Sequence, residues 1–83
     1  MTIRVLFFAK IKESLGVNFI DLKLTTPTSI EEIRNSLFCE FIENKSLFLP
    51  KNSLVAVNQE IITENIMINQ NDEVAFFPPV TGG

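Results

Sequence analysis

The chain ends in the residues best suited to chemistry, the pair Gly82-Gly83. A terminal glycine presents a carboxylate on a backbone without side chains, a form that fits a narrow channel in another protein. Pro78-Pro79 stiffens the base of this segment in an extended conformation, and residues 78–83 span at most roughly 20 Å. We therefore expect 78–83 to be a flexible arm that reacts on a partner, although chain ends are often simply frayed.

The rest of the composition excludes most internal active sites. The 83-residue chain has no His and a single cysteine, Cys39. These counts exclude Ser/His/Asp and Cys/His catalysis within the chain and predict no metal site. Gly16 is the one glycine outside the terminal pair, so a phosphate-binding loop is excluded too. We interpret Cys39 as a packing residue, Glu31-Glu32 as helix capping and Asp72-Glu73 as turn solvation.

Charge and hydrophobicity narrow the classes of partner. A net charge of -3 with seven scattered basic residues argues against nucleic acid. The sequence shows no signal peptide and no apolar run near the roughly 20 residues of a membrane helix, so we expect no membrane contact. A single cysteine allows no intrachain disulfide, which fits the reducing cytoplasm. Hydrophobic residues make up 46% of the chain and eight are Phe, which predicts some exposed apolar surface for a partner.

Residues 1–77 are expected to form the one domain that positions the arm. Alternating apolar residues predict strands at 3–9, 19–24, 54–57, 60–62 and 73–77. Residues 10–15 are too short for more than a helical turn, which Gly16 ends. Residues 42–53 read as a loop, with 47–49 as a possible packing segment.

One helix is predicted after Pro27. Thr28 or Ser29 can cap it, and Glu31 or Glu32 completes a capping box. Its apolar stripe recurs at spacings of three and four residues, whereas the polar positions between face water. The stripe consists of Ile30, Ile33, Leu37, Phe38 and Phe41, and the water-facing positions are Glu31, Arg34 and Asn35.

The element order is two strands, a helix and three strands. It favours an α+β fold of the β-grasp, ubiquitin-like type, a mixed sheet with one main helix packed on one face, although other α+β rolls share it. Alternation in the last strand places Val74 and Phe76 under the helix and Phe77 on the open face of the sheet, beside the arm. An exposed Phe77, with Ile61 or Ile62 as neighbour, would suit a docking surface.

Several segments resemble one family, the small subunits of molybdopterin synthase. The resemblance is carried by DEVAFFPPVTGG at 72–83, VLFFA at 5–9, AVNQ at 56–59 and Pro27-Thr28, and so spans the whole chain. Asn71 stands where the family commonly has Gly, and Asn tolerates left-handed backbone well.

The resemblance implies a sulfur carrier. Gly83 would be adenylated with ATP by a ubiquitin-activating-like adenylyltransferase, and a sulfur donor enzyme would convert it to a thiocarboxylate. The large subunit of molybdopterin synthase would then use that sulfur on cyclic pyranopterin monophosphate. The chain would bind no permanent cofactor and would not catalyse alone. The resemblance fits two assemblies equally: a heterodimer of the small and large subunits, and a heterotetramer built from two such heterodimers.

The same resemblance assigns the partner-binding residues. Gly82 would keep the passage narrow, Phe77 and Ile61 would line the interface, and Lys12 would add a peripheral contact. The arm residues Pro78, Pro79, Val80 and Thr81 would enter the partner. Sulfur carriers for thiamine synthesis or tRNA thiolation, ubiquitin-like modifiers and a plain interaction domain remain alternatives.

Overall fold

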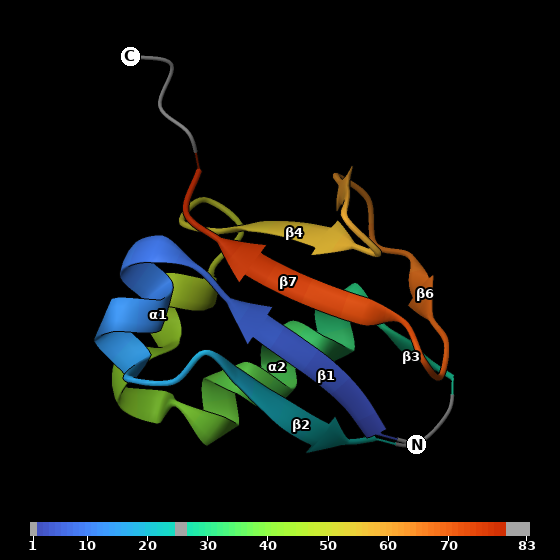
Figure 1. Ribbon diagram of the computed structural model, residues 1–83, viewed down its shortest axis with the longest axis horizontal. Coiled ribbons are helices and arrows are strands. Elements are labelled where there is room, and N and C mark those ends of the chain that lie inside the picture. The colour runs from blue at the N-terminus through green and yellow to red at the C-terminus, as the bar shows by residue number, and fades with distance from the viewer. Residues whose placement is uncertain (1, 25–26, 80–83) are drawn as a thin grey trace.

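A computed structural model describes residues 2–24 and 27–79 (Figure 1). Five strands form one mixed sheet in the order β2-β1-β7-β4-β5, in which β1 and β7 run parallel and the other neighbours antiparallel. The parallel pair places the last strand in the middle of the sheet. The strands are β1 (Thr2–Phe7), β2 (Phe19–Lys23), β4 (Leu54–Val57), β5 (Glu60–Ile62) and β7 (Glu73–Phe77).

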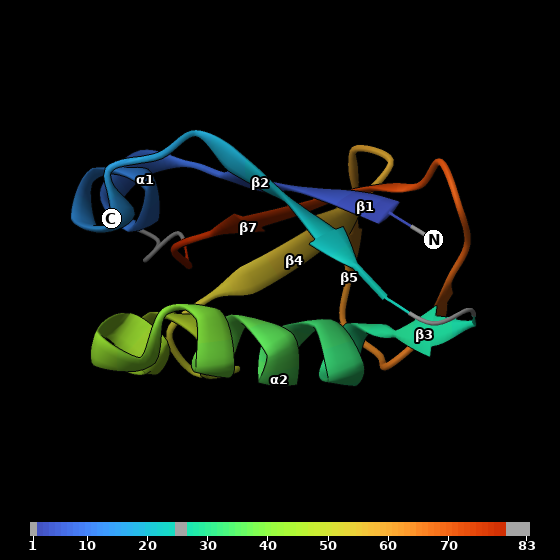
Figure 2. The same ribbon diagram turned by 90° about the horizontal axis from the view of Figure 1, so that it is seen from below.

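The main helix, α2 (Ile30–Glu40), lies under one face of this sheet, as Figure 2 shows. Ser29 caps it, since its Oγ accepts a 3.2 Å hydrogen bond from the backbone N–H of Glu32. The Glu32 carboxylate accepts a 3.0 Å bond from the Thr28 hydroxyl. The predicted α+β β-grasp fold is therefore confirmed.

Two segments differ from their predicted structure, and one small sheet was not predicted. Residues predicted as one turn form a seven-residue helix, α1 (Ala9–Leu15), which Gly16 ends at φ 76°. The expected loop begins with a 3-10 helix, η1 (Ile42–Phe48). A second, two-stranded sheet of β3 (Thr28–Ser29) and β6 (Met67–Ile68) was not predicted, because two residues show no period.

Phe48 explains why η1 forms in a polar segment. Its ring is fully buried, 5.8 Å from the Phe7 ring centre and 5.7 Å from that of Phe76. Arg34, predicted to face water, instead donates to the backbone carbonyl of Phe48 and, at 2.9 Å, to the Ser53 hydroxyl. Burial lowers the pKa of Arg34 from its ordinary value. Long-range packing and charged hydrogen bonds thus hold this segment against α2.

The predicted hairpin between β4 and β5 is confirmed. Asn58 and Gln59 both have positive φ, 52° and 70°, as in a type I′ turn. The Asn58 amide also bonds the backbone N–H of Glu73 and the carboxylate of Asp72, each at 3.0 Å. Asn71 has φ 77°, the left-handed backbone that its residue type tolerates.

Candidate functional site

The face of the sheet opposite α2 carries a row of apolar side chains. Strand register aligns one residue from each strand across the whole sheet. Small side chains occupy the central positions, with larger ones at the two edges. In spatial order from β2 to β5 the row is Phe19, Leu6, Ala75, Ala56 and Ile61.

A second row lies beside it, at the end of the sheet where β7 finishes. Phe77 pairs with Leu54 of β4, and Phe8 follows β1 and donates its N–H to the carbonyl of Phe76 at 3.2 Å. Together the two rows form what we call the open-face patch. It consists of Leu6, Phe8, Phe19, Leu54, Ala56, Ile61, Ala75 and Phe77.

Three large side chains of this patch are exposed, whereas its central residues Ala56 and Ala75 are buried. Ile61 is 58% exposed, Phe8 48% and Phe19 41%, whereas Phe77 is half-buried. Contiguous large apolar side chains on one face of a small domain mark an interaction site. The patch is therefore a candidate docking surface.

The arm begins at this patch. Phe77 is the last residue of β7, Pro78 is half-buried and Pro79 is exposed. Because β7 is bonded on both sides, its end is fixed relative to the patch. The helix α1 contacts β7, and the two lie side by side in Figure 1. Lys12 is on this helix and is exposed.

An ion pair borders the patch at the β2 edge. Arg4 Nε and Nη2 donate to the Asp21 carboxylate at 2.9 and 3.2 Å. The guanidinium also lies over the Phe19 ring, 4.1 Å from its centre. The hydrogen bonds from Arg4 hold the pKa of Asp21 below its usual value and raise the pKa of Arg4. This contact packs the Arg4 guanidinium against Phe19 on the open face.

The predicted site residues lie as follows. Phe77 is on the open face, and Ile61 shares that face, whereas Ile62 packs against the core. Lys12 is on α1 and does not belong to the open-face patch. Val80, Thr81, Gly82 and Gly83 lie outside the described residues.

Four large members of the patch were not predicted. They are Leu6, Phe8, Phe19 and Leu54. Alternation in the first strand puts Leu6 and Phe8 on one face, and this signal could have identified them. The contribution of β2 and β4 depends on strand order and register.

Other kinds of site find little support in residues 2–24 and 27–79. This part of the chain holds no cluster of three His, Cys, Asp or Glu side chains suited to a metal. None of its helices has the length and hydrophobicity to cross a membrane. Cys39 is exposed, so its interpretation as a packing residue is wrong.

Known proteins resemble this chain over nearly its whole length. The model of the ThiS family matches residues 5–83. A molybdopterin synthase sulfur carrier subunit from Dictyostelium discoideum is 44% identical over 84 residues, covering 96% of this chain and 94% of the relative.

Two solved structures share the fold. A putative molybdopterin converting factor subunit 1 from Pyrococcus furiosus superposes with a TM-score of 0.81 at 19% identity, covering 96% of this chain and 99% of the other. A complex of subunits 1 and 2 of molybdopterin-converting factor from Helicobacter pylori contains a chain matched at TM-score 0.68 and 25% identity, with both chains fully covered. By sequence and fold, the chain belongs to the ThiS family, among the molybdopterin synthase sulfur carrier subunits.

Proposed function

We propose that this chain carries sulfur on Gly83 as a thiocarboxylate and delivers it to a molybdopterin synthase large subunit. The observation that carries the proposal is the continuity of the open-face patch with the end of β7. Phe77 belongs to the patch and directly precedes 78–83. A partner that covers the patch therefore holds the arm close to its own reactive pocket.

The chemistry follows from what a carboxylate can do. A carboxylate is a poor electrophile, so ATP on a separate activating enzyme converts it to an acyl-adenylate. A sulfur donor then displaces AMP and leaves a thiocarboxylate, whose ionised sulfur is a far better nucleophile than the oxygen it replaces. Because the chain has no His, the large subunit supplies the catalytic side chains. We place this chemistry in the cytoplasm, which suits a chain with one cysteine.

Mass analysis tests the sulfur carrier. Protein isolated together with its native activating enzyme and sulfur donor should contain a fraction in which one terminal oxygen is replaced by sulfur. Deletion of Gly83 should abolish that fraction and leave the urea unfolding midpoint unchanged, since the buried core is built from residues between Ile3 and Phe76. A chain that never exchanges oxygen for sulfur would instead be an interaction domain.

Reconstitution tests the pathway. The thiocarboxylated chain, mixed with a molybdopterin synthase large subunit and cyclic pyranopterin monophosphate, should yield the dithiolene. Replacement of Gly82 by Phe should block this transfer without loss of partner docking, because the patch is untouched. A thiocarboxylated chain that yields no dithiolene would point to thiamine synthesis or tRNA thiolation.

A further inference from the structure

The outer edge of β2 is a second surface with binding capacity. β2 ends the five-stranded sheet on one side. Phe7 donates its N–H to the carbonyl of Asn18 at 2.8 Å, and register then assigns the β1-facing hydrogen bonds to Asn18, Ile20 and Leu22. The backbone N–H and C=O groups of the alternate residues, Phe19, Asp21 and Lys23, therefore point away from the sheet. Such an edge is a template for one more strand.

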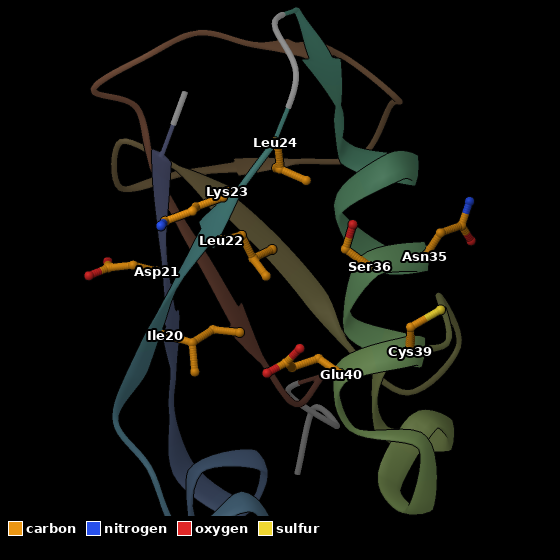
Figure 3. Close-up of a pocket in the computed structure, with 9 residues that line it drawn as sticks. All are labelled: Ile20, Asp21, Leu22, Lys23, Leu24, Asn35, Ser36, Cys39 and Glu40. Carbon is orange, nitrogen blue, oxygen red and sulfur yellow. The ribbon is translucent and has the colours of Figure 1, made fainter.

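A groove runs along this edge, between β2 and α2. It has a volume of about 520 Å³. Figure 3 shows Ile20 and Leu22 directed toward α2, and Ser36 and Glu40 directed from α2 toward β2. Side chains of an added strand would enter this groove at every second position.

On the opposite face, β2 presents two charges of opposite sign. Asp21 and Lys23 point away from α2 in Figure 3. Asp21 is paired with Arg4, and its side chain is 42% exposed. Among the described residues Lys23 has no ion-pair partner. This face of the edge therefore carries one acidic and one basic side chain, two residues apart.

We infer that β2 pairs antiparallel with β2 of a second copy of this chain, about a two-fold axis at Leu22. In this register Asp21 lies opposite Lys23 of the second copy, and Lys23 opposite its Asp21. Both are residues whose backbone groups point outward, so they form the hydrogen-bonded pairs of the new ladder. On the groove side Leu22, which is already buried in the monomer, lies opposite its own copy, and the half-buried Ile20 lies opposite Leu24 of the second copy.

The neighbouring two-fold registers are less favourable. An axis at Asp21 or at Lys23 places that charged side chain opposite its own copy, and like charges directly opposite each other destabilise a sheet. An axis at Ile20 places Asp21 opposite Phe19 and Lys23 opposite Val17, which pairs no charges. Charge and apolar alternation therefore select one self-complementary register, and two-fold closure limits the assembly to a dimer.

This dimer is independent of the proposed function, because it uses the β2 edge rather than the terminus. A single pair of short strands buries little surface, so we expect weak, concentration-dependent association. Its signature is specific. As the protein concentration rises toward millimolar, the amide protons of Asp21 and Lys23 should shift and exchange more slowly, whereas those of Ile20 and Leu22 are already bonded to β1.

Charge substitutions measured by sedimentation equilibrium test the contact. Lys23→Asp turns both attractive pairs repulsive and should weaken self-association by about tenfold or more. Lys51→Asp makes the same charge change at an exposed position in the segment before β4 and should leave self-association unchanged. Ile61→Asp alters the open-face patch and should also leave it unchanged. Loss of association in Ile61→Asp but not in Lys23→Asp would overturn the proposal in favour of the patch.

Disulfide trapping tests the register in a Cys39→Ser background. A mixture of Asp21→Cys and Lys23→Cys chains should form a mixed disulfide, because Cα atoms of directly opposite hydrogen-bonded residues lie roughly 5.5 Å apart. Asp21→Cys chains alone should not cross-link. Rapid cross-linking of Asp21→Cys with itself would overturn the two-fold axis at Leu22, and a protein that stays monomeric at millimolar concentration would overturn the dimer.

Discussion

Two neighbouring isoleucines on β5 allow an effect on partner docking to be distinguished from an effect on folding stability. Ile61 lies on the open face and Ile62 on the core side of the same strand. Burying a whole side chain of this size is worth about 1.5–3 kcal/mol, and 58% of Ile61 is exposed. If the large subunit covers that fraction, Ile61→Ala should cost about 0.9–1.7 kcal/mol of binding, or about 5- to 20-fold in Kd.

The matched variant is Ile62→Ala. It removes a side chain that packs against the core and should lower the free energy of unfolding by about 1–2 kcal/mol. Its Kd for the large subunit should stay near that of the unmodified chain. Titration calorimetry gives Kd, and urea unfolding gives stability. The open-face patch would be refuted as the docking surface if Ile61→Ala bound the large subunit with the Kd of the unmodified chain. Equal losses of affinity in Ile61→Ala and Ile62→Ala would refute it as well.

Three further substitutions probe other parts of the molecule. Phe77→Ala should raise the Kd for the large subunit about tenfold, and because Phe77 is half-buried it should also lower the free energy of unfolding by about 1–2 kcal/mol; calorimetry and urea unfolding separate the effects. Arg34→Met should destabilise the fold by about 2–3 kcal/mol in urea, since it leaves the Ser53 hydroxyl and a backbone carbonyl of η1 without their charged donor; a smaller loss than Lys51→Met would contradict this. Arg4→Ala should raise the pKa of Asp21 toward 3.8 in an NMR titration. Because the folded-state pKa of Asp21 is lowered, the pair stabilises the fold above the unfolded pKa, and this contribution is lost as pH falls through the folded pKa. An unchanged Asp21 titration would rule out that coupling.

The sequence predicted the parts of the fold that local periodicity determines. Alternation in β7 placed Val74 and Phe76 in the core and Phe77 on the open face. The Ser29 cap and the apolar spacing of α2 located the main helix. In these segments the local preference and the tertiary contacts agree, so the residues alone were sufficient.

Prediction failed for segments whose structure depends on contacts with residues distant in the sequence. The segment 42–48 is mostly polar and has no clear period, so its 3-10 helix was not predicted. The packing segment predicted at 47–49 is confirmed, because Phe48 is buried among rings from β1 and β7 and its carbonyl accepts a hydrogen bond from Arg34. The open-face patch was only partly predicted for a similar reason. Ile61 and Phe77 come from different strands, and only the order β7-β4-β5 places both beside Leu54 and Ala56.

The position of β7 has a consequence for how fast the terminus can react. Residues 78–83 span at most roughly 20 Å from the fixed end of that strand. Once a partner is docked on the open-face patch, the terminal glycine is confined to a small volume around the partner's pocket, at an effective concentration in the millimolar range or above. Docking therefore needs little affinity of its own. A weak, quickly reversible contact is enough to deliver the terminus and then release the spent carrier to its next partner.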